Sequence, residues 1–385
     1  MSMNNILILE TTGYTINNPN LIGIINILEK NNFNVSLSTV KRNFDQTLKN
    51  NKVKTFFVNF YAERIIEKLC NYFLPTRLIK FFFNYSKIEK FDFIIGVDTY
   101  GVIFSNIISK KYNTPIIFLS YEIFFKTEVG KVLKNLEIQA CSNILVAVSQ
   151  DSERGKKLSY ENKINIENII NIPVSNAGYV GRKKSLYLNN KYNISIASKI
   201  VILAGSIEKW TMTNEILSTL DLWPKDWVLF LHNRNSNEKI KKKYKKFLSN
   251  RLIISNESIK HADELNLLYN SCDLGIAFYR PTYESYYLGD NIKYIGMSSG
   301  KINNYIQFGL PVLINDFGEY SGVINNHKVG YSVNSEYDIP NVLNKINKKS
   351  LTNYSASCEL FFNTFLDLNN TIKPLLEILQ KNQFN

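Results

Sequence analysis

The first half of the chain alternates between short apolar runs and longer segments with helical spacing of their apolar residues. The apolar runs predict strands at Ile6–Glu10, Asn34–Val40, Phe91–Val97, Pro115–Ser120 and Ile144–Ser149. The helical spacing predicts helices at Asn20–Lys30, Tyr100–Lys111 and Glu128–Cys141. Strands that alternate with helices usually pair in parallel and are covered by those helices. We therefore expect an α/β domain with a doubly wound sheet over residues 1–176.

The alternation restarts after the polar segment Ser175–Lys199, which is expected to be a linker. Strands are predicted at Lys199–Gly205, Trp227–Asn233, Arg251–Ser255, Leu274–Tyr279 and Pro311–Asp316. Helices are predicted at Thr213–Leu220, Glu238–Leu248, Ala262–Asn270 and Lys301–Phe308, and an amphipathic helical tail follows over 353–385. A second Rossmann-like domain is expected over 177–352. Because open parallel sheets bind ligands at the carboxyl ends of their strands, a ligand site is expected in a cleft between the two domains.

One stretch, NIKYIGMSSGKINNYIQFGLPVL from Asn291 to Leu313, is typical of a loop, helix and buried strand that hold an anion. Ser298, Ser299 and Gly300 are small and let backbone N–H groups approach a ligand. A helix start favours an anion by about 0.3–1 kcal/mol, and a hydrogen bond from Lys301 to a phosphate would add roughly 1.5–3 kcal/mol. A plain N-cap without a ligand explains the same residues equally well.

The SSGK to GLPVL segment closely resembles the donor-nucleotide segment of bacterial GT-B glycosyltransferases, especially those related to glycosyltransferase family 4. The resemblance covers the chain from Ile6 to about Leu376, and three further segments carry it: Val148–Leu158, Ile202–Trp210 and His261–Tyr279. It implies an acceptor-side domain over 1–176, a nucleotide-sugar-binding domain over 177–352, and a tail over 353–385 that packs back on the first domain.

The resemblance also implies where the donor binds. The donor residues it suggests are Gly205, Ser206, His232, Tyr279, Ser298, Ser299, Gly300, Lys301 and Asn304. Lys209 would supply a second charge to the diphosphate, although a solvated loop lysine is an equal alternative. Because lysines and a helix start can stabilise the diphosphate leaving group, and no Asp-x-Asp motif follows a strand, we expect no metal and no cofactor beyond the nucleotide sugar.

The chain departs from the family pattern at three positions, which indicates a divergent branch. Family 4 enzymes commonly carry two glutamates eight positions apart, where this chain has Gly296 and Asn304. Asn304 can still bond a ribose diol. The arginine usually found after the first donor-domain glycine is Ser206 here.

Three residues are candidates on the acceptor side. Gly13 follows the first strand, Asp98 follows FDFIIGV, and Glu122 follows PIIFLS, in the loop where many relatives place a functional histidine. A carboxylate at the end of a strand can accept a proton from an acceptor hydroxyl. Capping or ion pairing explains Asp98 and Glu122 as well, so both interpretations stay open.

Composition limits the partners. The chain has 385 residues, a formal charge of +13 and four cysteines, Cys70, Cys141, Cys272 and Cys358, which form no C-x-x-C pair. Neither a zinc site nor a disulfide scaffold is expected. No apolar run reaches the roughly 20 residues of a membrane span, and no signal peptide is evident. A cytoplasmic protein, attached at most peripherally to the inner face of the plasma membrane, is therefore expected.

The region 41–90 combines positive charge with many aromatic residues. Phe57, Tyr61, Ile65, Leu69 and Phe73 have the spacing of one helix face. That face could cover the first sheet or insert at an anionic membrane surface. Because the aromatic residues follow helical core spacing and no nucleic-acid motif is present, nucleic acid is not expected as a partner.

These observations favour a hexosyl- or other glycosyltransferase. It would move a sugar from a nucleotide diphosphate donor, UDP favoured, to a growing surface glycan such as capsule, lipopolysaccharide or another polysaccharide, with a glycan or lipid-linked saccharide as acceptor. Two alternatives remain: a sugar-nucleotide epimerase of the same fold, and a non-catalytic nucleotide-sugar-binding subunit of a glycan assembly complex.

Overall fold

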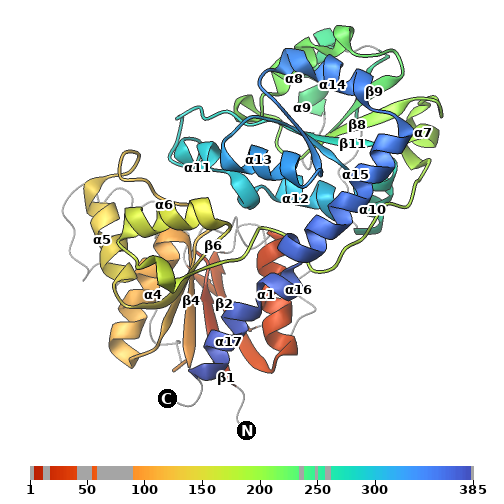
Figure 1. The fold of residues 1–385 in the computed structure, drawn as a ribbon. Coiled ribbons are helices and arrows are strands. Elements are labelled where there is room, and N and C mark those ends of the chain that lie inside the picture. The colour runs from red at the N-terminus through yellow and green to blue at the C-terminus, as the bar shows by residue number, and fades with distance from the viewer. Residues whose placement is uncertain are drawn as a thin grey trace. The chain divides into compact units, whose positions relative to one another are not determined.

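The structure is a computed structural model that describes residues 4–11, 18–40, 54–58, 90–233, 238–247, 250–255 and 262–382. The chain divides into two compact units. The first comprises Met1–Ala177, Ser285–Tyr287 and Leu368–Asn385, and the second comprises Gly178–Glu284 and Leu288–Asp367. Each unit contains one parallel sheet flanked by helices (Figure 1), which confirms the predicted α/β class.

The first unit is built on a seven-stranded parallel sheet with the order β3-β2-β1-β4-β5-β6-β7. Its strands are β1 (Asn4–Leu9), β2 (Phe33–Val40), β3 (Lys54–Val58), β4 (Phe93–Val97), β5 (Ile116–Leu119), β6 (Ile144–Ser149) and β7 (Ile169–Asn171). Its helices before the tail are α1 (Pro19–Lys30), α4 (Asp98–Tyr112), α5 (Lys131–Cys141) and α6 (Ser152–Asn162), with a 3₁₀ turn at Ile166–Asn168. The order of the strands reverses between β1 and β4, which is where such sheets bind ligands.

The second unit contains a six-stranded parallel sheet with the equivalent order β10-β9-β8-β11-β12-β13. Its strands are β8 (Lys199–Ala204), β9 (Trp227–His232), β10 (Leu252–Ile254), β11 (Leu274–Ala277), β12 (Val312–Asn315) and β13 (Gly330–Val333). Its α-helices are α7 (Tyr187–Tyr192), α8 (Thr213–Ser218), α9 (Glu238–Lys243), α10 (Ala262–Asn270), α11 (Asp290–Lys293), α12 (Gly300–Gln307), α13 (Glu319–Asn326), α14 (Ile339–Lys345) and α15 (Lys348–Phe361). Short 3₁₀ turns lie at Lys209–Thr211, Leu220–Leu222, Lys245–Phe247, Gly296–Ser298 and Glu336–Asp338, and a π-helical turn at Phe362–Leu366 follows α15. Here the order reverses between β8 and β11.

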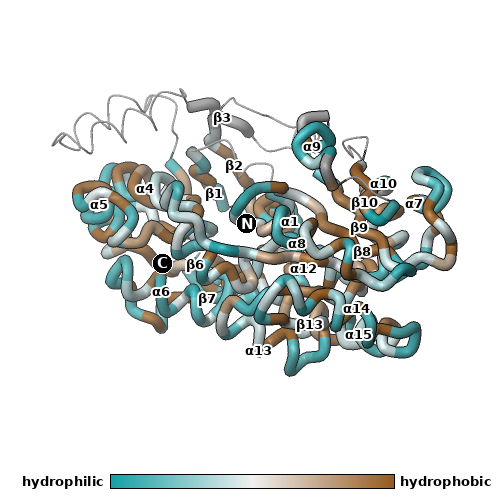
Figure 2. Tube along the Cα trace, turned by 90° about the horizontal axis from the view of Figure 1, so that it is seen from above, coloured by the Kyte–Doolittle hydropathy of each residue, from teal (hydrophilic) through white to brown (hydrophobic). Residues whose placement is uncertain are grey.

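The central strands are apolar on both faces, as sheets covered on both sides require. β4 and β5 are buried along their whole length, and so are β9 and β11. In the hydropathy view the strands are mostly brown and the outer turns of the helices teal (Figure 2). Among the residues that the structure describes, none of the helices combines the length and apolar character needed to cross a membrane.

One expected element is different. The prediction that Phe57 lies on a helix is wrong, because Lys54–Val58 forms strand β3. This strand pairs in parallel with β2, from Ser36↔Lys54 to Val40↔Val58. Backbone hydrogen bonding to the neighbouring strand overrides the i, i+4 spacing of the aromatic residues. The rest of 41–89 lies outside the described residues, and the membrane interpretation of 41–90 therefore stays a prediction.

The expected tail over 353–385 is divided between the units at Leu368. α15 belongs to the second unit, whereas α16 (Leu368–Thr371) and α17 (Lys373–Lys381) belong to the first. The Leu368 N–H donates to Asn176 O at 3.2 Å. Apolar residues of the two last helices complete the core of the first sheet: Leu368, Ile372, Leu375 and Leu379.

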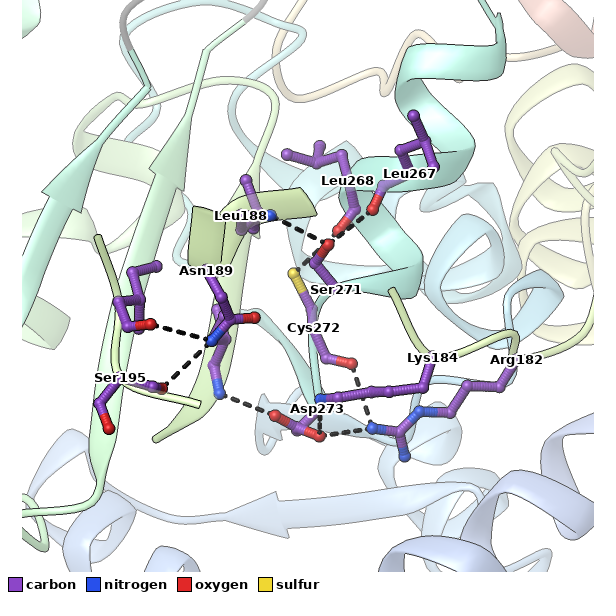
Figure 3. Close-up of polar contacts among 12 residues, drawn as sticks. Arg182, Lys184, Leu188, Asn189, Ser195, Leu267, Leu268, Ser271, Cys272 and Asp273 are labelled. Carbon is purple, nitrogen blue, oxygen red and sulfur yellow. Dashed lines mark hydrogen bonds and ion pairs between the residues drawn. The ribbon is translucent and has the colours of Figure 1, made fainter. Parts of the chain in front are cut away.

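The polar segment expected as a linker is hydrogen-bonded to the second unit, and one carboxylate accepts several of these bonds. Asp273, buried between α10 and β11, accepts hydrogen bonds from the Arg182 guanidinium, from Lys184 Nζ at 2.9 Å and from the Ile200 N–H at 2.9 Å (Figure 3). The nearby Asn189 side chain donates to the carbonyl oxygens of Ile194 and Ser195. These bonds fix the segment against the start of β8.

Candidate functional site

The carboxyl ends of β8 and β11 form the switch point of the second sheet, and Gly205 lies there. Its φ of +95° is in the region that favours glycine. The Gly205 N–H donates to His232 O, at the end of β9, over 2.9 Å. The chain thus turns sharply out of the sheet directly after β8.

A contact between α12 and β11 places the start of α12 at this switch point. Gly275 in β11 has no side chain, and a Cβ atom there would lie 2.2 Å from Tyr305 Cδ2. The buried Tyr305 ring therefore packs directly on the strand, and its hydroxyl accepts the Ala204 N–H at 2.9 Å. Because Lys301 lies one turn before Tyr305, both side chains project from the same face of the helix.

Lys301 is the principal charged group of this site. Its side chain runs beside Gly205, where a Cβ atom would lie 3.5 Å from Lys301 Cε. Its Nζ is buried and has no hydrogen-bond partner among the described residues, and the Tyr279 ring centroid lies 5.7 Å away. Burial lowers the pKa of Lys301 to about 8. A buried ammonium without a partner is unfavourable, so the geometry calls for an anion.

The two predicted serines use their hydroxyls within the fold. Ser299 is the N-cap of α12: its Oγ accepts the Ile302 N–H at 3.3 Å and lies 2.7 Å from the Tyr279 hydroxyl. Ser298 Oγ donates to Ile295 O at 2.7 Å. The plain N-cap interpretation is therefore right for the Ser299 side chain. Lys301 Nζ and the backbone N–H groups at the start of α12 are what the loop offers to an anion.

Aromatic rings line the site beside Lys301. Tyr279 is buried, and Trp210 stacks on it with a centroid distance of 5.7 Å and an interplanar angle of 12°. Phe317 contacts Tyr279 edge-on at 5.8 Å. The backbone of Tyr279 is fixed by Asn315, whose side-chain amide accepts its N–H and donates to its carbonyl. The rings give Lys301 an environment of low polarity.

His232 is buried at the end of β9, and its Nδ1 has no hydrogen-bond partner in the described part of the chain. Burial lowers its pKa to about 4. The ring is therefore neutral at neutral pH and can give a ligand one donor or one acceptor. Its carbonyl accepts the Gly205 N–H, so His232 lies beside the glycine that the Lys301 side chain also approaches.

Three other residues predicted to contact the donor are exposed or only partly buried. Lys209 Nζ forms an ion pair with Glu284 Oε1 at 3.0 Å, and both side chains are more than half exposed. Ser206 is exposed, and Asn304 is partly buried on α12. The ion pair is compatible with a surface lysine, and a second charge on the diphosphate from Lys209 stays a prediction. Gly13 lies outside the described residues.

The first unit presents Asp98 at its own switch point, at the start of α4. Asp98 has φ +56°, a strained conformation for a residue with a side chain. Its Oδ1 accepts the N–H groups of Tyr121 at 2.7 Å and Glu122 at 2.9 Å. Burial, followed by the negative charge of Glu122, raises the pKa of Asp98 to about 8.

Glu122 follows β5 and is partly buried beside Asp98. Burial raises its pKa to about 7, and the positive charge of Arg154 opposes that rise. A carboxylate that titrates near neutral pH suits general base catalysis. Two nearby residues escaped the sequence analysis: Arg154 and Glu10, which follows β1 and accepts from Thr39 Oγ1 at 2.5 Å. A buried arginine in a polar helix gives no sequence signal.

Over the described ranges, no group of three or more His, Cys, Asp and Glu side chains could hold a metal ion. The second unit thus has a cationic site around Lys301, and the first unit, described by itself, has a site with raised carboxyl pKa values.

Comparisons with known proteins identify the fold. No family model matches the chain, and no curated protein matches it in sequence. Solved structures match the chain in fold. HepE of Anabaena in complex with UDP-glucose matches with TM-score 0.71 and 11% identity over 98% of this chain and 100% of that one. A glycosyltransferase from Rickettsia africae matches with TM-score 0.69 and 14% identity over 100% of both chains. WaaG, a glycosyltransferase involved in lipopolysaccharide biosynthesis, matches with TM-score 0.62 and 12% identity over 97% of this chain and 99% of that one. The chain has the GT-B fold that its sequence predicted.

Proposed function

From the GT-B fold, we propose that this chain is a glycosyltransferase whose donor is a nucleoside diphosphate sugar bound at the carboxyl end of the second sheet. The observation that carries the proposal is the buried ammonium of Lys301 beside Gly205 at the start of α12, which has no hydrogen-bond partner within the described part of the chain. HepE, which has this fold, is solved with UDP-glucose and with UDP, which supports UDP as the nucleotide.

The chemistry of this site matches the needs of a diphosphate leaving group. Negative charge grows on the diphosphate as the glycosidic bond breaks, and fixed donors at that position stabilise the transition state. Lys301 and the N–H groups of α12 supply such donors, and the aromatic wall of Tyr279 and Trp210 strengthens them by excluding water. We include no metal or further cofactor in this proposal.

On the acceptor side, Glu122 is the proposed proton acceptor and Asp98 the residue that orients it. Asp98 accepts the Glu122 N–H and so fixes the backbone that carries the base. An acceptor hydroxyl becomes a nucleophile when it loses its proton to such a base. A growing surface glycan, free or lipid-linked, is the proposed acceptor, and WaaG's part in lipopolysaccharide biosynthesis supports this class.

Calorimetric titration with UDP tests the donor site. Wild-type protein is expected to bind UDP, and Lys301→Ala to weaken binding by about 10- to 150-fold, which corresponds to the loss of one charge-assisted hydrogen bond. The exposed Lys225→Ala in the same unit is the matched control and should bind as wild type does. Equal affinity of the Lys301 and Lys225 variants would remove the diphosphate assignment.

Product analysis separates the proposal from its alternatives. A transferase releases UDP only when a saccharide acceptor takes the sugar, whereas an epimerase converts the nucleotide sugar without any acceptor. A protein that binds the donor tightly but neither converts nor transfers it over a broad acceptor panel would be a binding subunit.

A further inference from the structure

Arg154 of α6 is a buried arginine that the proposed chemistry has not used. It is 1% exposed, although it lies in a helix of mostly polar residues. Its Nε donates to Gln150 Oε1 at 2.7 Å, and its Nη2 donates to Tyr121 O at 2.7 Å. A guanidinium is expensive to bury, so its full burial requires a matching set of acceptors and charges.

These bonds end on the loop that carries Glu122. Tyr121 O accepts from Arg154, and the preceding carbonyl, Ser120 O, accepts from Gln150 Nε2 at 2.6 Å. Because Gln150 is itself bonded to Arg154, one guanidinium fixes two successive peptide groups directly before Glu122.

The same loop is fixed from its other sides. Asp98 accepts the N–H groups of Tyr121 and Glu122, and the Tyr121 hydroxyl donates to Asn20 Oδ1 at 2.9 Å. Lys134 of α5 donates to Phe124 O and forms a buried ion pair with Glu137 at 2.8 Å. The loop is therefore held from four different elements, and α6 supplies the positive charge that acts on Glu122.

Charged groups face this loop from several elements. The carboxyl group of Asp98 comes from α4, Glu10 at the end of β1 acts on Asp98, and Arg154 from α6 is the positive group that acts on Glu122. Asp151 and Glu153, at the start of α6, also interact with the guanidinium, and α5 contributes the paired Lys134 and Glu137. Because burial opposes the ionisation of Glu122, the charged form depends on the positive charge of Arg154.

We infer that Arg154 is a positioning residue for the transfer reaction: its guanidinium holds the Ser120–Phe124 loop in place and keeps Glu122 as the anion that accepts the acceptor's proton. That the reaction is a sugar transfer is taken from the proposed function. The dependence of the Glu122 charge on Arg154 does not need that proposal, because it can be measured in the protein without substrate.

The test compares Arg154→Gln, which removes the charge, with Arg154→Lys, which keeps it but cannot make both bonds. In Arg154→Gln the acidic limb of the kcat/KM pH profile should move upward by about 1 pH unit or more, because the opposite charge beside Glu122 is lost. Arg154→Lys should keep the limb near its wild-type position and lower kcat. UDP affinity, measured in parallel, should not change in either variant.

The matched control is Arg251→Gln in the second unit. Arg251 also donates to backbone carbonyls, those of Leu220 and Trp223, but it lies in neither proposed site. It should lower the melting temperature without moving the limb. If Arg154 were only structural, both of its variants would lower the melting temperature and leave the acidic limb of the pH profile unchanged. That result would overturn the inference.

A direct titration keeps the inference testable if transfer is not observed or if Arg154→Gln does not fold. The carboxyl carbon of Glu122 is followed by ¹³C NMR in ligand-free protein and assigned by its loss in Glu122→Gln. Gln150→Leu removes one anchor of the guanidinium and should shift the Glu122 midpoint upward, and Arg154→Gln should shift it further where it folds. Unmoved midpoints would refute the inference, whereas absence of UDP binding with moved midpoints would refute only the proposed function.

Discussion

At the scale of single residues, side-chain type predicted the cation of the proposed donor site but not how its neighbours are used. Lys301 was identified because a lysine after small residues at a helix start is typical of anion sites. The hydroxyls of Ser298 and Ser299 could not be excluded from the sequence, since capping depends on where the helix begins. Arg154 could not be found, because burial of a charged residue is a property of the fold.

Lys301 predicts how UDP binding depends on pH. Its pKa of about 8 in the free protein must rise when a phosphate pairs with it, so binding takes up a proton above that pH. UDP affinity should therefore fall by up to about tenfold per pH unit above pH 8. Titrations in buffers of different ionisation enthalpy measure the proton uptake. Lys301→Arg, which stays charged, should show a flat affinity over this range.

Asp98 predicts a stability gain at high pH when its charge is removed. Its folded-state pKa of about 8 lies above the unfolded value of 3.8, so the folded state binds more protons and wild-type stability falls as pH rises from about 4 through 8. Asp98→Asn keeps an acceptor for the two N–H groups, and its melting temperature should exceed that of wild type increasingly over this window. The exposed Asp221→Asn should show no such trend, and a constant difference would contradict the assignment.

At the scale of elements, the central strands were predicted because parallel strands buried on both faces give continuous apolar runs. The strands β7 and β13, at the edges of the two sheets, were not predicted. They have three and four residues with partly exposed side chains, so their sequences resemble loops. The contact of α12 with β11 was equally hidden, because Gly275 is a long way from Tyr305 along the chain.

Gly275→Ala tests how α12 is positioned. The new methyl group would lie 2.2 Å from the Tyr305 ring, so α12 must shift or the strand must bend, at about 1–3 kcal/mol or more in the free energy of unfolding. Because Lys301 is on the same helix, UDP affinity should fall as well. Gly322→Ala on α13 adds its methyl group in open space and should be neutral or slightly stabilising. Denaturant unfolding measures the free energy of unfolding of both variants, and titration with UDP measures their affinity for it.

At the scale of the whole molecule, two units each have their own core, and the chain completes the first unit only with its last helices. α15 packs in the second unit, and α16 and α17 supply Leu368, Ile372, Leu375 and Leu379 to the core of the first. The sequence predicted a helical tail and its resemblance suggested the return, but the point of division, at the break in helical structure at Asp367, depends on packing.

Leu379→Ala should weaken the first unit alone. Deleting a fully buried leucine side chain costs about 2–5 kcal/mol, so amide hydrogen exchange should accelerate in β1, β4 and α1 while that of β8, β9 and β11 stays unchanged. Leu360→Ala, at an exposed position on α15, is the control and should change neither. Acceleration spread equally over both sheets would mean that the units unfold together.

This chain path sets an order for folding on the ribosome. The second unit, Gly178–Glu284 and Leu288–Asp367, is synthesised before the helices that close the first unit. During that time, the apolar surface that Leu375 and Leu379 later cover stays open on the nascent first unit. The first unit is thus synthesised first but completed last. Chaperones that bind exposed apolar surface can therefore act on it for longer than on the second unit.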